Sequence, residues 1–370
     1  MEDKYISFSP YFCGLSNVIM SYEVALALSH ITNRKIILPP KTWISHIEKF
    51  VNIWEIFDKD VVKSEFNCVE FSEVPEIKEN IHDIRGDNSY TQNITKYIED
   101  LYDVKYVNHK NEYDCLYMSN VIFSGKQHNT QDFKNFIGTF SKRKIIYLNV
   151  PNKFIHFEGN LFGSFWYHVY PGNSFKRDDL KRKINKSFRY KKKFYDMSER
   201  VKEKIGEYNA LHVRRGDFLS VRDSSYLDSI NDGEKILEKI LPIIPNDIPL
   251  YIATDEKNLD FFEPIKKSYE VYFYRDFNYV SNDFEAAVME QIICSNSNNF
   301  YGSWFSTYTK RINVMRGCDE KYAPDWKAYN YDPPLSEVPN FNSPFPWNFT
   351  KDGKWHWFDS YHPQWTFEEN

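Results

Sequence analysis

The sequence has no long apolar run. No window of about 18 apolar residues, roughly the length that begins to span a bilayer, occurs among its 370 residues. The opening residues, Met1 to Lys4, are largely charged and lead directly into a strand-like segment, which does not resemble a secretory signal. We therefore predict a cytoplasmic protein without a transmembrane segment.

The sequence also lacks the cysteine spacings of a metal site or a disulfide framework. Its five cysteines, an odd number, are scattered at positions 13, 68, 115, 294 and 318 without any CxxC pair. This pattern favours free thiols that pack as small apolar residues in a reducing compartment. We find no cluster of His and Asp with metal-ligand spacing, so no metal and no cofactor are predicted.

A strong excess of positive charge is absent as well. The formal net charge is −5 and the isoelectric point is near 6.1. These values argue against a nucleic-acid or anionic-membrane binder, although they leave room for a small basic pocket. At 370 residues the chain is long for one hydrophobic core and suits two domains.

The order of apolar segments predicts an α/β protein. A strand over 5–9, an apolar helix through 19–28 and a strand over 35–40 form a βαβ unit. From residue 208 onwards strands and helices alternate, as in a doubly wound parallel sheet. We predict an N-terminal domain over 1–200, a second domain over 201–330 and an aromatic-rich extension over 331–370.

Between the two βαβ-like regions the pattern is weaker. Short strands are expected at 115–118 and 144–150, and the dense mixture of charges over 176–205 predicts a solvated helix pair near the domain junction.

The strongest candidate site follows the apolar strand 210–213. His212, Arg214, Arg215 and Gly216 stand at its carboxyl end, where open α/β sheets bind ligands. Guanidinium groups match phosphate oxygens and keep their charge, so this segment predicts a diphosphate site. The alternative is an ordinary surface ion pair between an arginine and Asp217.

Two further strand ends carry polar side chains. Ser306 and Thr307 stand where a helix begins, so their hydroxyls and the helix N–H groups could bind an anion or simply cap the helix. Asp255 ends the strand 249–254 and could accept hydrogen bonds from a nucleoside or cap the next helix. Gly14 and Asn17 begin the first helix, facing the expected interdomain cleft.

Taken in order, these motifs resemble the GDP-fucose-dependent transferases, including protein O-fucosyltransferases and α1,2- and α1,6-fucosyltransferases. The HxRRGD segment at 212–217 and the glycine-containing loop at 14–17 resemble elements of that group. Closer to the protein O-fucosyltransferase branch are the Ala-Thr-Asp strand end at 253–255 and Ser306-Thr307-Tyr308, where that branch shows Ser-Thr-Phe. The resemblance covers roughly residues 5–40 and 208–317.

The resemblance implies a GT-B architecture, with two Rossmann-like domains facing a cleft, and metal-independent, inverting transfer of L-fucose from GDP-fucose. Arg214 would bind the β-phosphate and stabilise charge as the glycosidic bond breaks. His212 would contact the ribose or guanine, and Asp255 the nucleoside. The other donor-binding residues that it implies are Arg215, Ser306, Thr307, Tyr308, Gly14 and Asn17.

The acceptor half of the reaction is not evident in the sequence. The loop reads Cys-Gly-Leu-Ser instead of the group's Gly-Gly-x-Gly, and no glutamate stands there to act as base. Asp217 and Asp223 are candidates for the base. The acceptor is expected to be a hydroxyl of a glycan or protein. Two alternatives stay open, namely another nucleotide-sugar donor and a non-catalytic nucleotide- or carbohydrate-binding module.

Overall fold

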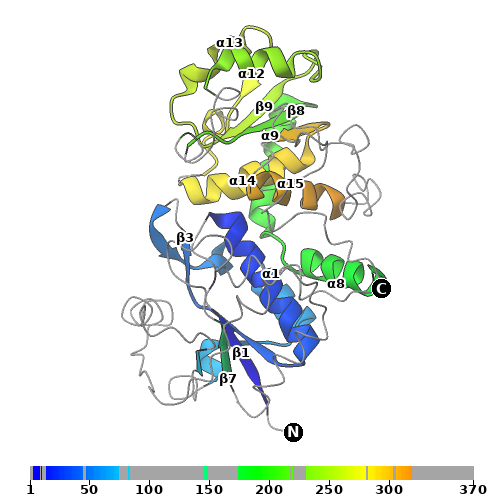
Figure 1. The fold of residues 1–370 in the computed structure, drawn as a ribbon. Coiled ribbons are helices and arrows are strands. Elements are labelled where there is room, and N and C mark those ends of the chain that lie inside the picture. The colour runs from blue at the N-terminus through cyan, green and yellow to red at the C-terminus, as the bar shows by residue number, and fades with distance from the viewer. Residues whose placement is uncertain are drawn as a thin grey trace, which may run out of the picture. The chain divides into compact units, whose positions relative to one another are not determined.

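The computed structural model describes residues 3–8, 10, 14–44, 47–74, 82–83, 145–148, 174–216, 219, 231–280, 282–302 and 306–318. Contacts within the chain divide it into two compact units at the bond between Arg189 and Tyr190 (Figure 1). This division falls ahead of the predicted limit at residue 200, which lies inside a helix. Each unit is described by itself.

The described part of the first unit contains a five-stranded sheet in the order β5-β2-β1-β7-β6, in which neighbouring strands run parallel. Parallel neighbours need crossover connections, and the predicted βαβ unit supplies one. The strands are β1 (Tyr5–Phe8), β2 (Lys35–Leu38), β5 (Cys68–Glu70), β6 (His82–Asp83) and β7 (Ile145–Leu148).

Helix α1 (Leu15–Thr32) makes the crossover from β1 to β2. It begins directly after Gly14 and ends at Asn33, whose positive φ of 54° forms a left-handed cap. Its Tyr22 joins a buried aromatic cluster in which Phe57 stacks on Phe188 with ring centroids 4.0 Å apart. This cluster ties α1 to α2 (Lys59–Glu65) and α8 (Ser174–Ser187).

The sequence gives little indication of the antiparallel hairpin that follows β2. Strands β3 (Thr42–Ile44) and β4 (Lys49–Val51) pair around Glu48, which has a positive φ of 48°. The strands are only three residues long, which is too short for a recognisable alternation of apolar and polar residues.

The described part of the second unit contains a four-stranded parallel sheet in the order β10-β9-β8-β11. All five residues of the central strand β8 are buried, as expected for a strand covered on both faces. The strands are β8 (Asn209–Val213), β9 (Leu250–Thr254), β10 (Val271–Tyr272) and β11 (Phe300–Gly302).

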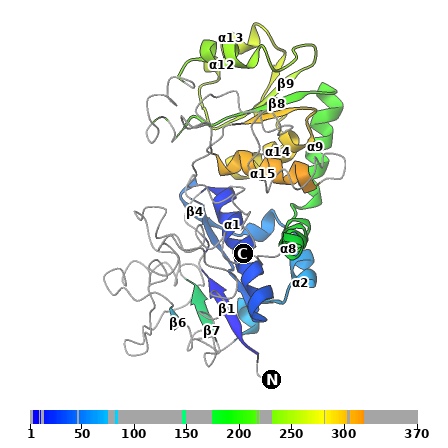
Figure 2. The ribbon, with the colours of Figure 1, turned by 45° about the vertical axis from the view of Figure 1, so that its right-hand side comes forward.

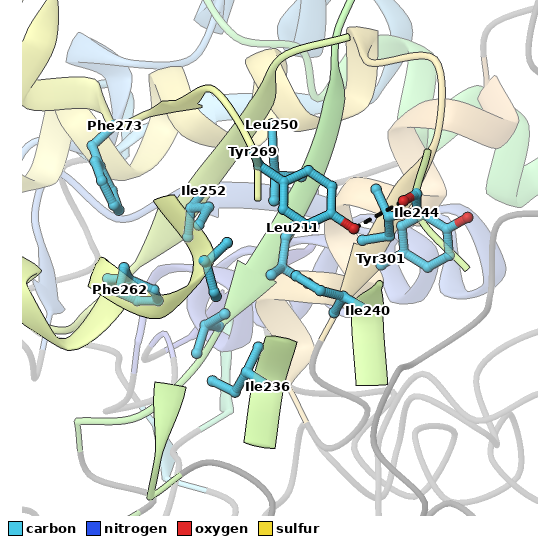
Figure 3. Packing of buried hydrophobic residues seen from close by; sticks show 12 residues of the cluster. Leu211, Ile236, Ile240, Ile244, Leu250, Ile252, Phe262, Tyr269, Phe273 and Tyr301 are labelled. Carbon is cyan, nitrogen blue, oxygen red and sulfur yellow. Dashed lines mark hydrogen bonds between the residues drawn. The ribbon is translucent and has the colours of Figure 1, made fainter. Parts of the chain in front are cut away.

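Helices cover both faces of this sheet (Figures 1 and 2). Leu211 and Ile252 lie in a core with α12 and α13, which Figure 3 shows closed by a hydrogen bond from Tyr269 to the carbonyl of Ile244. Ala210 and Tyr251 each stand one residue earlier along their strand and therefore face the other side of the sheet. There they pack against α9, α14 and α15. The helices are α9 (Lys192–Ile205), α12 (Gly233–Ile240), α13 (Glu263–Lys266), α14 (Asp283–Asn296) and α15 (Thr307–Cys318).

Several predicted elements differ in extent. The helix expected to reach Ile244 ends at Ile240. Leu241 keeps helical backbone angles as the C-cap, but Pro242 has no N–H group to extend the helical hydrogen bonds. The strand expected to include Tyr274 stops at Tyr272, where the 3₁₀ turn η7 (Tyr274–Asp276) follows. Helix α14 was expected to be amphipathic, yet it is buried from Val288 to Ser295 on all sides.

Other expectations agree in kind. The predicted strand over 144–150 contains β7, and the charged stretch 176–205 is the helix pair α8 and α9. The strand expected at 115–118 and the extension at 331–370 lie outside the described residues, and the predicted domain limits remain a prediction.

Candidate active site

The candidate site lies at the carboxyl edge of the second sheet. Val213 pairs with Thr254, and His212 pairs with Gly302. These pairings bring the residues that follow β8, β9 and β11 to one edge. Brought to this edge are Arg214, Asp255 and Ser306, which are separated in sequence but were all predicted to bind the donor.

His212 is buried on the sheet face that α15 covers. Its Nδ1 lies 2.7 Å from Oγ1 of Thr309, and its ring centroid lies 4.8 Å from that of Tyr308. Burial, followed by the nearby positive charge of Arg214, lowers the pKa of His212 to about 3. The imidazole is therefore neutral at physiological pH and serves as a hydrogen-bonding group rather than a cation.

Gly302 makes this arrangement sterically feasible. A Cβ atom at residue 302 would lie 2.4 Å from Cγ2 and 2.7 Å from Oγ1 of Thr309. Glycine thus lets α15 approach β11 closely enough for Thr309 to reach His212.

Asp255 organises the turn that follows β8. Its Oδ1 accepts hydrogen bonds from the backbone N–H groups of Arg215, at 2.7 Å, and of Gly216, at 3.0 Å. A Cβ atom at residue 216 would come within 2.7 Å of Oδ2 of Asp255, so glycine permits this approach. Asp255 therefore has a defined structural task within the site, in addition to the nucleoside contact that the resemblance implies.

Arg214 leaves the strand at the same turn. Its side chain is only 16% exposed, and its Nε lies 3.9 Å from Oδ2 of Asp255. That separation is longer than a charge-assisted hydrogen bond, so Asp255 and Arg214 interact here through charge alone. Such an arginine suits a polyanionic ligand brought to the sheet edge.

Arg215 is engaged differently from Arg214. Its guanidinium group pairs with Glu256 and stacks on the ring of Phe261, with 3.9 Å between Cζ and the ring centroid. A carboxylate partner of this arginine among the described residues is therefore Glu256, a residue that the sequence pattern did not single out.

The start of α15 supplies the hydroxyl groups. The Oγ atom of Ser306 is buried and has no hydrogen-bond partner among the residues that the structure describes, which is uncommon for a buried polar group. Thr307 is the first residue of α15 and is partly exposed. The hydroxyl of Tyr308 donates to the carbonyl of Ala287 at 2.6 Å, so its ring contacts His212 while its oxygen is bound to α14.

Glu290 is a candidate that the sequence analysis missed. It lies in α14 at 6% exposure, and its carboxyl group lies beside the buried hydroxyl of Tyr251. Burial raises the pKa of Glu290 well above its ordinary value, although Tyr251 and Arg275 act to lower it. An acidic residue within the apolar stretch 286–293 was the available signal.

The remaining predicted residues divide into two groups. Gly14 precedes α1 in the first unit with extended backbone, and Asn17 lies in the first turn of that helix. Both are where the strand–loop–helix pattern placed them. Asp217 and Asp223, the candidate bases, lie outside the described residues.

Within the described ranges, no three His, Cys, Asp or Glu side chains come together as a metal site. The triplet Asp58-Lys59-Asp60 has the Asp-x-Asp spacing, but Asp58 caps α2 by accepting from the N–H of Val61. None of the helices described has the length and apolar character needed to cross a membrane.

The two parallel sheets with their covering helices define an α/β protein, and comparisons with known proteins agree with this class. Residues 5–319 match the family described as GDP-fucose protein O-fucosyltransferase. Curated relatives include GDP-fucose protein O-fucosyltransferase 2 of Plasmodium falciparum (isolate NF54), 27% identical over 76% of this chain and 63% of the relative. The protein of the same name from Caenorhabditis elegans is 33% identical over 30% of this chain and 26% of the relative.

Solved structures show the same fold. POFUT1 in complex with GDP-fucose superposes with a TM-score of 0.57 and 15% identity, covering 93% of this chain and 98% of that one. Its apo form gives the same TM-score over 85% and 95%. The chain belongs to the GDP-fucose protein O-fucosyltransferase family. It spans 63% of the length of its Plasmodium falciparum relative.

Proposed function

We propose that the protein transfers L-fucose from GDP-fucose to a hydroxyl group of a protein or glycan acceptor. The observation that carries the proposal is the sheet edge of the second unit, where the neighbouring strands β8 and β11 bring neutral His212, Arg214 and the start of α15 with Ser306 to the same side. Family membership supports the donor, since the family and the curated relatives are named for GDP-fucose and for protein O-fucosylation.

In this proposal Arg214 binds the diphosphate and neutralises the negative charge that develops on it. The bond between fucose C1 and the β-phosphate oxygen breaks, and the acceptor oxygen bonds to C1 from the opposite face, with inversion. Ser306 donates its hydroxyl hydrogen to a phosphate oxygen, and the N–H groups at the start of α15 add a positive dipole end. The neutral imidazole of His212 donates or accepts a hydrogen bond at the nucleoside.

We also propose that the reaction needs no metal, because an arginine and a helix N-terminus together offset the negative charge of the leaving diphosphate. Glu290 joins the site as a buried carboxyl group that interacts electrostatically with Asp255. We propose that Asp217 or Asp223 is the base that takes the proton of the acceptor hydroxyl. A GT-B arrangement and a cytoplasmic location are also part of this proposal.

The proposal is tested by ligand-induced stabilisation together with turnover. GDP-fucose and GDP should raise the melting temperature, whereas UDP should not, because a ligand stabilises only the state that binds it. Release of fucose from GDP-fucose without acceptor, unaffected by EDTA, should follow. Equal stabilisation by UDP would contradict the donor, and binding without turnover on an acceptor array would favour a non-catalytic module.

A further inference from the structure

The loop after β9 holds the turn after β8 through two separate carboxylates. Asp255 binds the backbone N–H groups of Arg215 and Gly216, whereas Glu256 binds the Arg215 side chain. Arg215 and Glu256 are only 14% and 15% exposed, and Phe261 covers the guanidinium face. Contacts of this kind, partly shielded from water, are stronger than surface ion pairs.

Glu256 is also held in place by hydrogen bonds that do not involve Arg215. Its N–H donates to Oγ1 of Thr254 at 3.1 Å, and that hydroxyl donates to the carbonyl of Val213 at 2.8 Å. Its Oε1 accepts the N–H of Asn258 at 2.9 Å. Burial acts to raise the pKa of Glu256, but the hydrogen bonds from Asn258 and Arg215 prevail, and the pKa lies below its ordinary value.

We propose that Glu256 and Phe261 are positioning residues that hold Arg215, and with it the turn that orients Arg214 toward the donor diphosphate. Arg215 then does not contact the donor. This inference rests on the proposed function, because it assigns the two adjacent arginines different tasks in the same site. The anchored side chain of Arg215 restricts the turn at one point, and Asp255 restricts the backbone of the same turn through its N–H groups.

The alternative task for Arg215 is direct binding of the diphosphate, and the two assignments predict opposite effects of neutralising Glu256. If Arg215 binds the diphosphate, Glu256→Gln removes a competing anion and leaves GDP binding equal or tighter. If Arg215 positions the turn, Glu256→Gln loosens it, and turnover falls although both arginines are present.

The test is a double-mutant cycle on the full chain, with GDP-fucose hydrolysis and calorimetric GDP binding as readouts. Glu256→Ala and Arg215→Ala should each lower kcat about tenfold, and the double variant should be no worse than the lower single one, since coupled residues are not additive. The charge exchange Arg215→Glu with Glu256→Arg should regain part of kcat. Lys257→Gln, a neighbouring exposed charge, is the matched control.

Three results would overturn the inference. The first is normal turnover with tighter GDP binding in Glu256→Gln. The second is a charge-exchange variant with a lower kcat than both Glu256→Ala and Arg215→Ala. The third is a set of Glu256 and Arg215 variants that melt at lower temperatures but keep the wild-type kcat while folded. Arg214→Ala, measured alongside, separates the two levels. If Arg214→Ala turns over GDP-fucose as fast as the wild type, the proposed function is contradicted. If Arg214→Ala loses turnover while the Glu256 variants keep wild-type turnover, only the positioning role is contradicted.

Discussion

His212 shows how burial determines the charge of a single residue. The neutral imidazole between Thr309 and Tyr308 fits the proposed donor site, because it adds no second positive charge beside Arg214. The same burial has a consequence for stability, because the unfolded chain binds a proton near pH 6.5 that the folded chain binds only near pH 3.

We therefore expect His212 to make the protein acid-sensitive. The stabilisation is complete above pH 6.5 and is lost as the pH falls toward 3, by about 2 kcal/mol between pH 7 and pH 5. His212→Gln should lower stability at pH 7 but flatten this dependence, as measured by urea unfolding at both pH values. His30→Gln, an exposed histidine at the end of α1, is the control. An unchanged slope in His212→Gln would contradict the neutral imidazole.

Ser306 gives a second prediction at this scale. Its buried hydroxyl has no partner within the described part of the chain, so Ser306→Ala should leave stability unchanged or raise it by up to about 1 kcal/mol. The same change should weaken GDP binding roughly tenfold or more, since it removes a donor to a charged group. Thermal melts and calorimetry measure the two effects, with exposed Ser64→Ala as control. A loss of stability with unchanged GDP affinity would make Ser306 a structural residue.

At the scale of elements, helix α14 departs from its expected pattern. Its sequence has polar residues at intervals, which predicts an exposed face, but α9 and α15 pack on it and the sheet covers another side. Glu290 is thereby enclosed, and burial raises the pKa of its carboxyl group.

Glu290→Gln should consequently stabilise the protein against unfolding. Because the folded-state pKa is raised, the wild-type carboxyl group favours folding below its unfolded pKa of 4.5, and this contribution is lost as the pH rises toward the folded-state pKa. The variant should therefore gain stability relative to wild type as the pH increases from 4.5, while GDP binding weakens. Unfolding curves across pH test this, with exposed Glu263→Gln as control. Equal pH dependence in wild type and variant would contradict a raised pKa.

The loops after β8 and β9 show what local sequence can and cannot predict. Arg214 and Asp255 were predicted to be neighbours because they follow apolar strands of a parallel sheet, and the register confirms it. The pairing of Arg215 with Glu256 was not predictable, because it depends on side-chain directions in two irregular loops. Phe261, in the 3₁₀ turn η6 (Leu259–Phe262), belongs to no repeating pattern either.

At the scale of the whole molecule, alternating strands and helices were sufficient to predict an α/β chain with parallel sheets. Strands such as β8 are apolar throughout and bounded by polar turns, so their type and order follow from sequence. Glu290 was missed because its importance depends on packing between α14 and distant elements. The hairpin of β3 and β4 was missed because its strands are too short to show alternation.

The central claim is that Arg214, at the carboxyl edge of the second sheet, binds the diphosphate of GDP-fucose. Calorimetric titration of GDP into wild type and Arg214→Ala tests it most directly, with Arg200→Ala on the exposed surface of α9 as control. The account predicts a loss of roughly 2–4 kcal/mol of binding free energy in Arg214→Ala, with abolished transfer, and none in the control. Equal GDP affinity and turnover in wild type and Arg214→Ala would contradict it.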